Sequence, residues 1–142
     1  MTENEREAML LALDDELLKG DVILSEWCTF ITRDADTSFI HGAFLACILT
    51  SVAAIETHLR SESGEAKRMR LAQLIDAAQL ESDLTADLHG LRRYRNRWVH
   101  VEDPWEDSEL LEHPEQHEAE LEQKALMCVR ALRRTIYNNP GV

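Results

Sequence analysis

A short stretch near residue 95 combines the side chains that acid–base chemistry on a phosphate requires. Residues 88–100 hold four arginines and no acid, and Arg95, Asn96 and His100 fall within one six-residue segment of it. A guanidinium donates paired hydrogen bonds to a phosphate, and a histidine that titrates near neutral pH takes or gives a proton. Asparagine can orient either group. We therefore interpret Arg95, Asn96 and His100 as candidate catalytic residues.

The charge along the chain reverses abruptly at this stretch. The 142 residues carry a formal net charge of −12, and the 22 residues from Val101 to Glu122 contain ten acids and no lysine or arginine. A basic stretch inside an acidic chain indicates a site rather than a generic solvated surface. Arg92, Arg93 and Arg97 are expected to supply supporting charge or salt bridges. The acidic loop, residues 101–113, could pair with these arginines and close the site.

The rest of the sequence predicts the helices that position the stretch. Apolar residues recur at helical spacing, and no segment has the alternation of a strand. Residues 33–38 are polar and predict a break. We expect one all-α domain over residues 1–142, a bundle of five or six helices with N-terminal helices in 1–35 and a core in 36–137. The predicted helices are Glu3–Lys19, Val22–Ile31, Phe39–Leu59, Ala66–Ala78, Ser82–His100 and Pro114–Tyr137.

The segment Phe39–Leu59 is the most apolar and is expected to form a central helix buried on nearly all sides. It is too polar and too short for a membrane span, which needs about 20 apolar residues. Glu56 lies on its apolar face, and a buried carboxylate requires a partner. Two alternatives remain open: Glu56 supports the site by holding a motif arginine or His100, or it bonds to another residue or to water. Trp27 is expected in the core.

The segment Arg95–His100 resembles the R-x4-6-H motif of HEPN domains (higher eukaryotes and prokaryotes nucleotide-binding), including the polar residue directly after the arginine. The resemblance implies a HEPN-like helical core over residues 36–137. It also implies a metal-independent endoribonuclease, often a toxin or defence component, that forms its active site as a homodimer. Arg95 would bind the phosphate, His100 would perform acid–base chemistry, and Asn96 would be the polar companion.

Composition narrows the remaining possibilities. Three widely spaced cysteines predict reduced, buried thiols in a cytoplasmic protein. The acidic balance argues against duplex DNA as a partner, no membrane partner is expected, and no cofactor or metal is predicted. His113 and His117 have a spacing that can bind zinc, as a weaker alternative. The main alternative is a catalytically inactive helical module that binds a nucleotide, an antitoxin or another protein.

Overall fold

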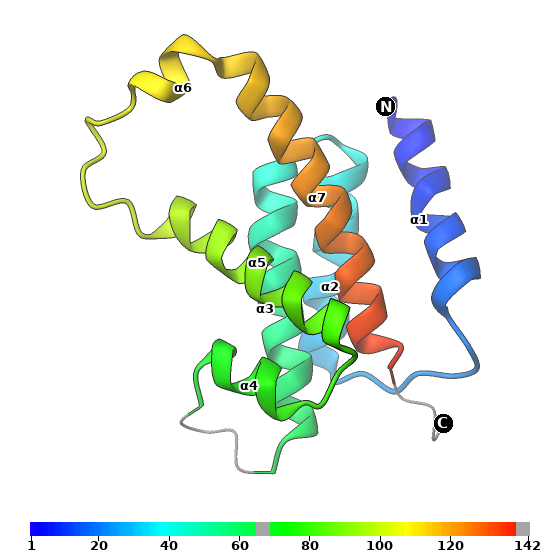
Figure 1. Cartoon of the computed structure of the whole chain (residues 1–142). Coiled ribbons are helices and arrows are strands. Elements are labelled where there is room, and N and C mark those ends of the chain that lie inside the picture. Colours follow the sequence, from blue (N-terminus) through cyan, green and yellow to red (C-terminus); the bar gives the residue numbers. More distant parts are fainter. Residues whose placement is uncertain (65–68, 139–142) are drawn as a thin grey trace.

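The computed structural model describes residues 1–64 and 69–138, and the regular structure in these ranges is entirely helical. Figure 1 shows the helices packed as a bundle. An all-α bundle is therefore confirmed. The described residues contain seven helices rather than five or six, because part of the acidic loop forms the short helix α6. The helices are α1 (Glu3–Leu17), α2 (Glu26–Ile40), α3 (Phe44–Glu62), α4 (Leu71–Ala77), α5 (Ser82–Val99), α6 (Ser108–Glu112) and α7 (Pro114–Ile136).

Helix α3 is the centre of the bundle. It packs against α2 and α7 along most of its length, and α4 and α5 lie against it as well. Its buried side chains form a wide stripe that includes Ile48, Val52 and Ile55, whereas Ala46 and Ala53 are exposed. The central position was predicted correctly, but the helix is not buried on nearly all sides.

The boundary between α2 and α3 differs from the prediction. The polar segment 33–38 continues α2, and the chain turns at His41–Ala43, where Gly42 has a φ of +78°. Residues 33–38 sustain a helix because most of their polar side chains face solvent while Ala35 and Phe39 remain buried. Polarity alone therefore did not mark a break. The predicted start at Val22 was also wrong, because Ser25 caps α2 by accepting a hydrogen bond from the Cys28 backbone N–H.

The remaining boundaries agree more closely with the predicted ones. Helix α5 ends at Val99, and α7 begins with Pro114 in its first turn, as expected. Helix α4 begins at Leu71. The predicted start of that helix at Ala66 falls outside the described residues.

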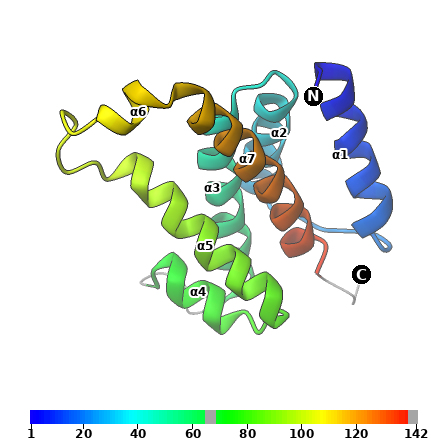
Figure 2. The same ribbon diagram turned by 45° about the horizontal axis from the view of Figure 1, so that its top comes forward.

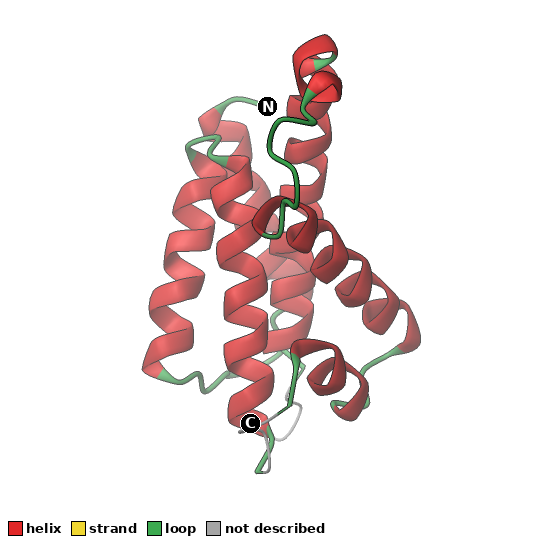
Figure 3. Cartoon of the chain, turned by 90° about the vertical axis from the view of Figure 1, so that its left-hand side faces the viewer, coloured by secondary structure: helices red, strands yellow, loops and turns green. Residues whose placement is uncertain are grey.

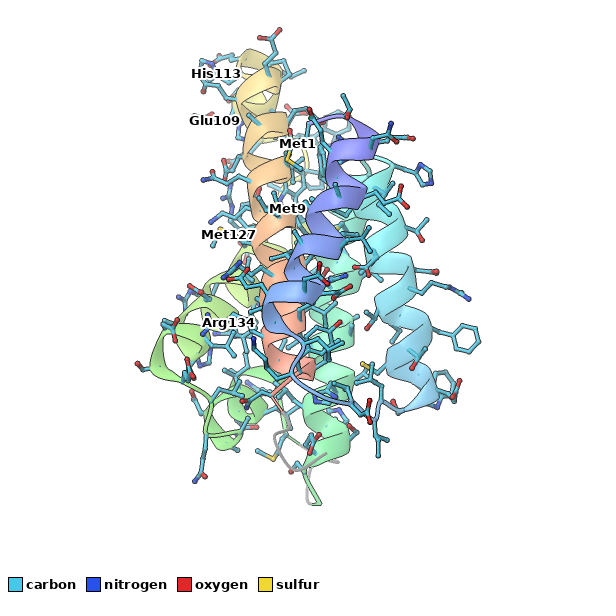
Figure 4. The ribbon with its side chains drawn as sticks, turned by 90° about the vertical axis from the view of Figure 1, so that its right-hand side faces the viewer. Met1, Met9, Glu109, His113, Met127 and Arg134 are labelled. Atoms are coloured by element: carbon cyan, nitrogen blue, oxygen red, sulfur yellow. The ribbon has the colours of Figure 1, made fainter. Side chains whose placement is uncertain are left out.

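A buried ion-pair network joins the N-terminal helix to the bundle. Arg133 of α7 donates hydrogen bonds to Asp14 of α1 at 2.8 Å and to both carboxylate oxygens of Asp36 of α2 at 3.0 and 2.8 Å. The Tyr137 hydroxyl donates to the same Asp14 carboxylate at 2.6 Å. Figure 4 shows α1 lying along α7, with Met9 and Met127 labelled on the two helices. Asp14 of α1 and Asp36 of α2 therefore have a structural role that the sequence did not indicate.

Two predictions about buried residues had different outcomes. Cys28, Cys47 and Cys128 are free and buried, as expected, and burial raises the pKa of the Cys47 thiol to about 12. Trp27 is not a core residue, because 78% of its surface is exposed on the outer side of α2. Helix α2 buries the face that carries Cys28, Ala35 and Phe39, and Trp27 lies outside that face. None of the described helices combines the length and apolarity needed to cross a membrane.

Candidate functional site

Three helices surround an open groove that contains the predicted motif. The cavity holds about 550 Å³ and lies where α3, α4 and the C-terminal half of α5 meet. Figure 3 looks onto this side of the molecule. We call it the arginine groove and define it by its lining residues: Glu56, Arg60, Arg70, Leu71, Ala72, Arg92, Arg95, Asn96 and His100. Arg95, Asn96 and His100, predicted as catalytic residues, therefore line one cavity together with Arg92 and Glu56.

The pattern of α5 explains why these residues point into the groove. Leu84, Leu88, Leu91 and Tyr94 form the buried face of the helix, which docks on α3, α4 and α7. Arg92 and Asn96 are one turn apart on the flank of this buried face, so they point along the surface of the bundle rather than into its core. Docking the apolar face thereby fixes the direction of the polar flank.

Arg95 and Asn96 form a local pair within the groove. The Nε–H of Arg95 donates to the Oδ1 atom of Asn96 at 2.9 Å. A guanidinium has five N–H donors, and this bond uses one of them. The terminal nitrogens of Arg95 remain available for an anion, and the bond to Asn96 restricts the orientation of the guanidinium. Asn96 therefore orients the guanidinium of Arg95, as a polar companion of this arginine would.

His100 reaches the groove because the helix ends immediately before it. Its backbone has φ −125° and ψ 60°, outside the helical region, although its N–H still donates to the Asn96 carbonyl at 3.0 Å. In a continuous helix, a separation of five residues would place His100 well around the cylinder from Arg95. The non-helical backbone at His100 removes that obstacle. The imidazole is exposed to solvent at the mouth of the groove.

The wall opposite α5 adds cationic side chains from two other helices. Arg60 of α3 donates to Glu56 at 3.0 Å and to the Met69 backbone carbonyl at 3.1 Å, while Arg70 precedes the first turn of α4. Glu56 thus has Arg60 as its partner, and its side chain is about one-third exposed rather than buried. Sequence reasoning missed Arg60 and Arg70 as groove residues. Only the packing of α3, α4 and α5 brings them near the motif.

Two arginines of the basic stretch stay outside the groove. Arg93 is exposed to solvent, and Arg97 lies 3.9 Å from Glu120 of α7 and stacks over the Tyr94 ring. Arg97 is thus a salt-bridge partner, one of the two predicted roles, whereas Arg93 faces solvent. The structure therefore divides the four arginines into two that line the groove and two that do not.

The acidic loop does not neutralise the groove. In Figures 1 and 2 the loop and α6 leave α5 on one side, whereas α4 lies on the other side. Across residues 1–64 and 69–138, no ion pair joins a carboxylate of the loop to Arg92 or Arg95. The Asp103 side chain instead accepts a hydrogen bond from the Trp105 backbone N–H at 3.1 Å. The arginines therefore face an open cavity.

The histidine pair considered for zinc lies far along the chain from the motif. His117 approaches Glu109 at 3.5 Å, and His113 is exposed between α6 and α7. Within the described ranges, no group of three or more His, Cys, Asp or Glu side chains could hold a metal ion. The zinc alternative therefore lacks a third ligand in this part of the chain.

Comparisons with known proteins give no match to the chain, whether with family models, with curated proteins or with solved structures.

Proposed function

We propose that this protein is an endoribonuclease of the HEPN type, acting as a toxin or defence component, that cleaves RNA without a catalytic metal ion. The observation that supports this function is that Arg92, Arg95, Asn96 and His100 line one open groove and are not paired with the acidic loop. Two further arginines, Arg60 and Arg70, line the same groove. A local positive groove on a chain of net charge −12 suits a polyanionic strand.

The proposed reaction is transfer of the phosphate to the neighbouring 2′-hydroxyl. The 2′-oxygen attacks phosphorus, its proton passes to a base, and the bond from phosphorus to the 5′-oxygen breaks. The departing 5′-oxygen takes a proton from an acid, which leaves a 2′,3′-cyclic phosphate and a 5′-hydroxyl. His100 is the acid–base group, and the free donors of Arg95 stabilise the charge that develops on the phosphate oxygens.

A homodimer follows from the number of protons that must move. The reaction needs both a base and an acid, and the motif provides one histidine per chain. A two-fold axis beside the groove would place a second His100 across the same cleft. We expect the active species to sediment at twice the mass of the chain.

The decisive experiment is an RNA cleavage assay in EDTA that compares the wild type with His100→Ala and His113→Ala. His113 is a matched control because it is also an exposed histidine but lies outside the groove. We expect the wild type and His113→Ala to yield cyclic phosphate ends, and His100→Ala to be slower by about 10²- to 10⁴-fold. Equal cleavage by His100→Ala would show that His100 is not the acid–base group.

The same assay separates the nuclease from the alternative function. If the wild type cuts no RNA, the protein is better explained as an inactive helical module that binds a nucleotide or a protein partner. Binding of RNA oligonucleotides to the wild type and to Arg95→Gln would then show whether the groove still recognises phosphate.

A further inference from the structure

Arg92 is held in the groove by a chain of polar contacts that the proposed chemistry does not use. His89 lies one turn before Arg92 on α5, and its Nε2 atom is 2.8 Å from an Asp76 carboxylate oxygen of α4. Because an ionised carboxylate only accepts, the Nε2 atom of His89 carries the proton. The opposite ring nitrogen, Nδ1, is then an acceptor when the ring is neutral, and it lies 3.5 Å from the Nη2 atom of Arg92.

Arg92 retains hydrogen-bonding capacity that the protein does not satisfy. Its Nε atom is buried and has no hydrogen-bond partner among the described residues. Buried donors are rarely left unpaired in folded proteins, so this nitrogen calls for an acceptor. Arg92 also lines the arginine groove, and no carboxylate in the described ranges forms an ion pair with it. The Nε atom itself is buried, so an anion in the groove would meet the terminal nitrogens of Arg92 and supply the missing negative charge.

The anchors of the two groove arginines on α5 lie in opposite directions along the helix. Arg95 bonds to Asn96, toward the C-terminal end, whereas Arg92 contacts His89, toward the N-terminal end. Arg92 also lies two turns before His100, roughly 12 Å along the helix axis. The two guanidiniums therefore have separate anchors on α5, so they suit two different phosphates better than a single one.

We propose that Arg92, positioned by His89 and Asp76, forms a second phosphate subsite in the arginine groove. The subsite binds the phosphate next to the one that Arg95 and His100 engage, so the groove takes a single RNA strand with at least two consecutive phosphates. This inference rests on the proposed ribonuclease function. The second subsite implies a minimum strand length, which Arg95 and His100 alone would not require.

The test uses short ribonucleotides that differ by one phosphate. The probes are a diribonucleoside monophosphate and the same molecule with an added 5′- or 3′-terminal phosphate. Each probe is used as the ribose form for kcat/KM and as a non-cleavable 2′-O-methyl form for Kd. In the wild type, one of the two added phosphates should improve kcat/KM and Kd by about tenfold or more, as a charge-assisted contact does. Arg92→Gln should reduce that gain to about twofold or less.

A neighbouring arginine supplies the matched control. Arg93→Gln removes the same charge from the next position of α5, but Arg93 is exposed and does not line the groove. Its gain from the added phosphate should equal that of the wild type. If Arg92→Gln keeps the full gain, or if Arg93→Gln loses as much, the subsite is wrong.

The positioning role of His89 has a test of its own. His89→Ala should reduce the gain from the added phosphate by about threefold, whereas His89→Gln should largely restore it. A glutamine amide can donate to Asp76 and accept from Arg92, as the neutral imidazole does. A merely structural role would lower melting temperature and would act equally on all probes. An unchanged gain in His89→Ala would remove His89 and Asp76 from the subsite.

The two proposals fail in different ways. Cleavage that depends on His100 but shows no gain from either added phosphate keeps the ribonuclease and overturns the second subsite. If no ribose probe is cut but the 2′-O-methyl probes show a gain that depends on Arg92, the subsite stands and the ribonuclease does not. Absence of any gain in the 2′-O-methyl series, with or without cleavage, overturns the subsite.

Discussion

The arginines of α7 and the two groove arginines of α5 have opposite surroundings. On α7, Arg130 bonds to Glu16, Arg133 to Asp14 and Asp36, and Arg134 to Glu81 and Asp83. Figure 4 labels Arg134 on the part of α7 near the start of α5. On α5, Arg92 and Arg95 contact a histidine and an asparagine, and no carboxylate in the described ranges pairs with either.

This contrast separates arginines that hold the fold from arginines that can bind a ligand. Arg133 is almost fully buried, with 3% of its side chain exposed. Burial alone lowers the pKa of Arg133, but the carboxylates of Asp36 and Asp14 outweigh that effect and raise it on balance. Neutral partners such as Asn96 orient a guanidinium without cancelling its charge. In a chain rich in acids, arginines that lack an acidic partner therefore indicate a binding site.

The largest expected effect on stability comes from breaking the network of α7. Arg133→Met leaves Asp14 and Asp36 without a countercharge and should lower the free energy of unfolding by about 3–5 kcal/mol. Arg95→Met removes an arginine that has no carboxylate partner among the described residues, and it should change the free energy of unfolding by less than about 1 kcal/mol. Urea denaturation of both variants measures the difference. Similar losses in the two variants would contradict the contrast between the helices.

The second prediction converts the groove arginines into paired ones. Ala72→Glu places a carboxylate in the groove wall, in the first turn of α4, where a negative charge suits the helix dipole. We expect the free energy of unfolding to stay unchanged and the Kd for a short RNA strand to rise by about fivefold or more.

The control for this change is Ala77→Glu, which adds the same charge at the far, exposed end of α4. Equilibrium binding by fluorescence anisotropy compares the two variants with the wild type. If both variants weaken binding equally, net charge rather than the groove governs the affinity.

The smallest expected effect concerns a buried histidine that is only partly paired, unlike the paired arginines of α7 and the groove arginines of α5. His58 of α3 is buried, its Nε2 atom is 3.4 Å from a Glu62 oxygen, and its Nδ1 atom has no partner in the described part of the chain. Burial lowers the pKa of His58, and Glu62 only partly offsets this. The unfolded chain therefore takes up the proton more readily than the folded one. The stability that neutral His58 contributes is therefore fully present above 6.5, the ordinary pKa of histidine. It declines as the pH falls below that value.

Replacing this histidine tests the direction of that dependence. Between about pH 7.5 and about pH 5, the melting temperature of His58→Gln should fall less than that of the wild type. Thermal unfolding at several pH values measures the two slopes. A steeper fall in the variant would mean that the protonated ring is the more stable buried form.

Periodicity was sufficient to predict the helical class and the flank of α5 that lines the groove. Arg92 and Asn96 are four residues apart, so helix geometry alone places them on one flank of α5. His100 follows at the same spacing but lies beyond the last helical residue, Val99. The start of α2 was predicted wrongly at Val22. Asp21, which directly precedes that position, is as favourable an N-cap type as Ser25, but Ser25 makes the actual hydrogen bond. Competing caps a few residues apart cannot be separated by composition alone.

The contributions of distant segments had no local signal. Arg60 and Arg70 join the groove only because α3 and α4 pack beside α5, and no short motif links them to His100. The non-helical backbone of His100 was equally invisible, since the sequence predicted only an approximate end of the helix. Arg133 did carry a signal that was not used. It lies next to Leu132 and one turn after Val129 on the inward face of α7, where a lone charge requires a partner.

The position of the acidic loop on the far side of α5 from α4 has a consequence for how fast a strand arrives. An approaching polyanion meets repulsion from most of the molecule and attraction only at close range to the groove. Moderate salt screens the long-range repulsion first, since the Debye length is about 10 Å at 0.1 M ionic strength. Association with RNA should therefore become faster with the first additions of salt and slower with further ones. For a strongly basic protein, in contrast, each addition of salt slows the association with a polyanion. The acids would act as a kinetic filter that favours strands arriving in alignment with the groove.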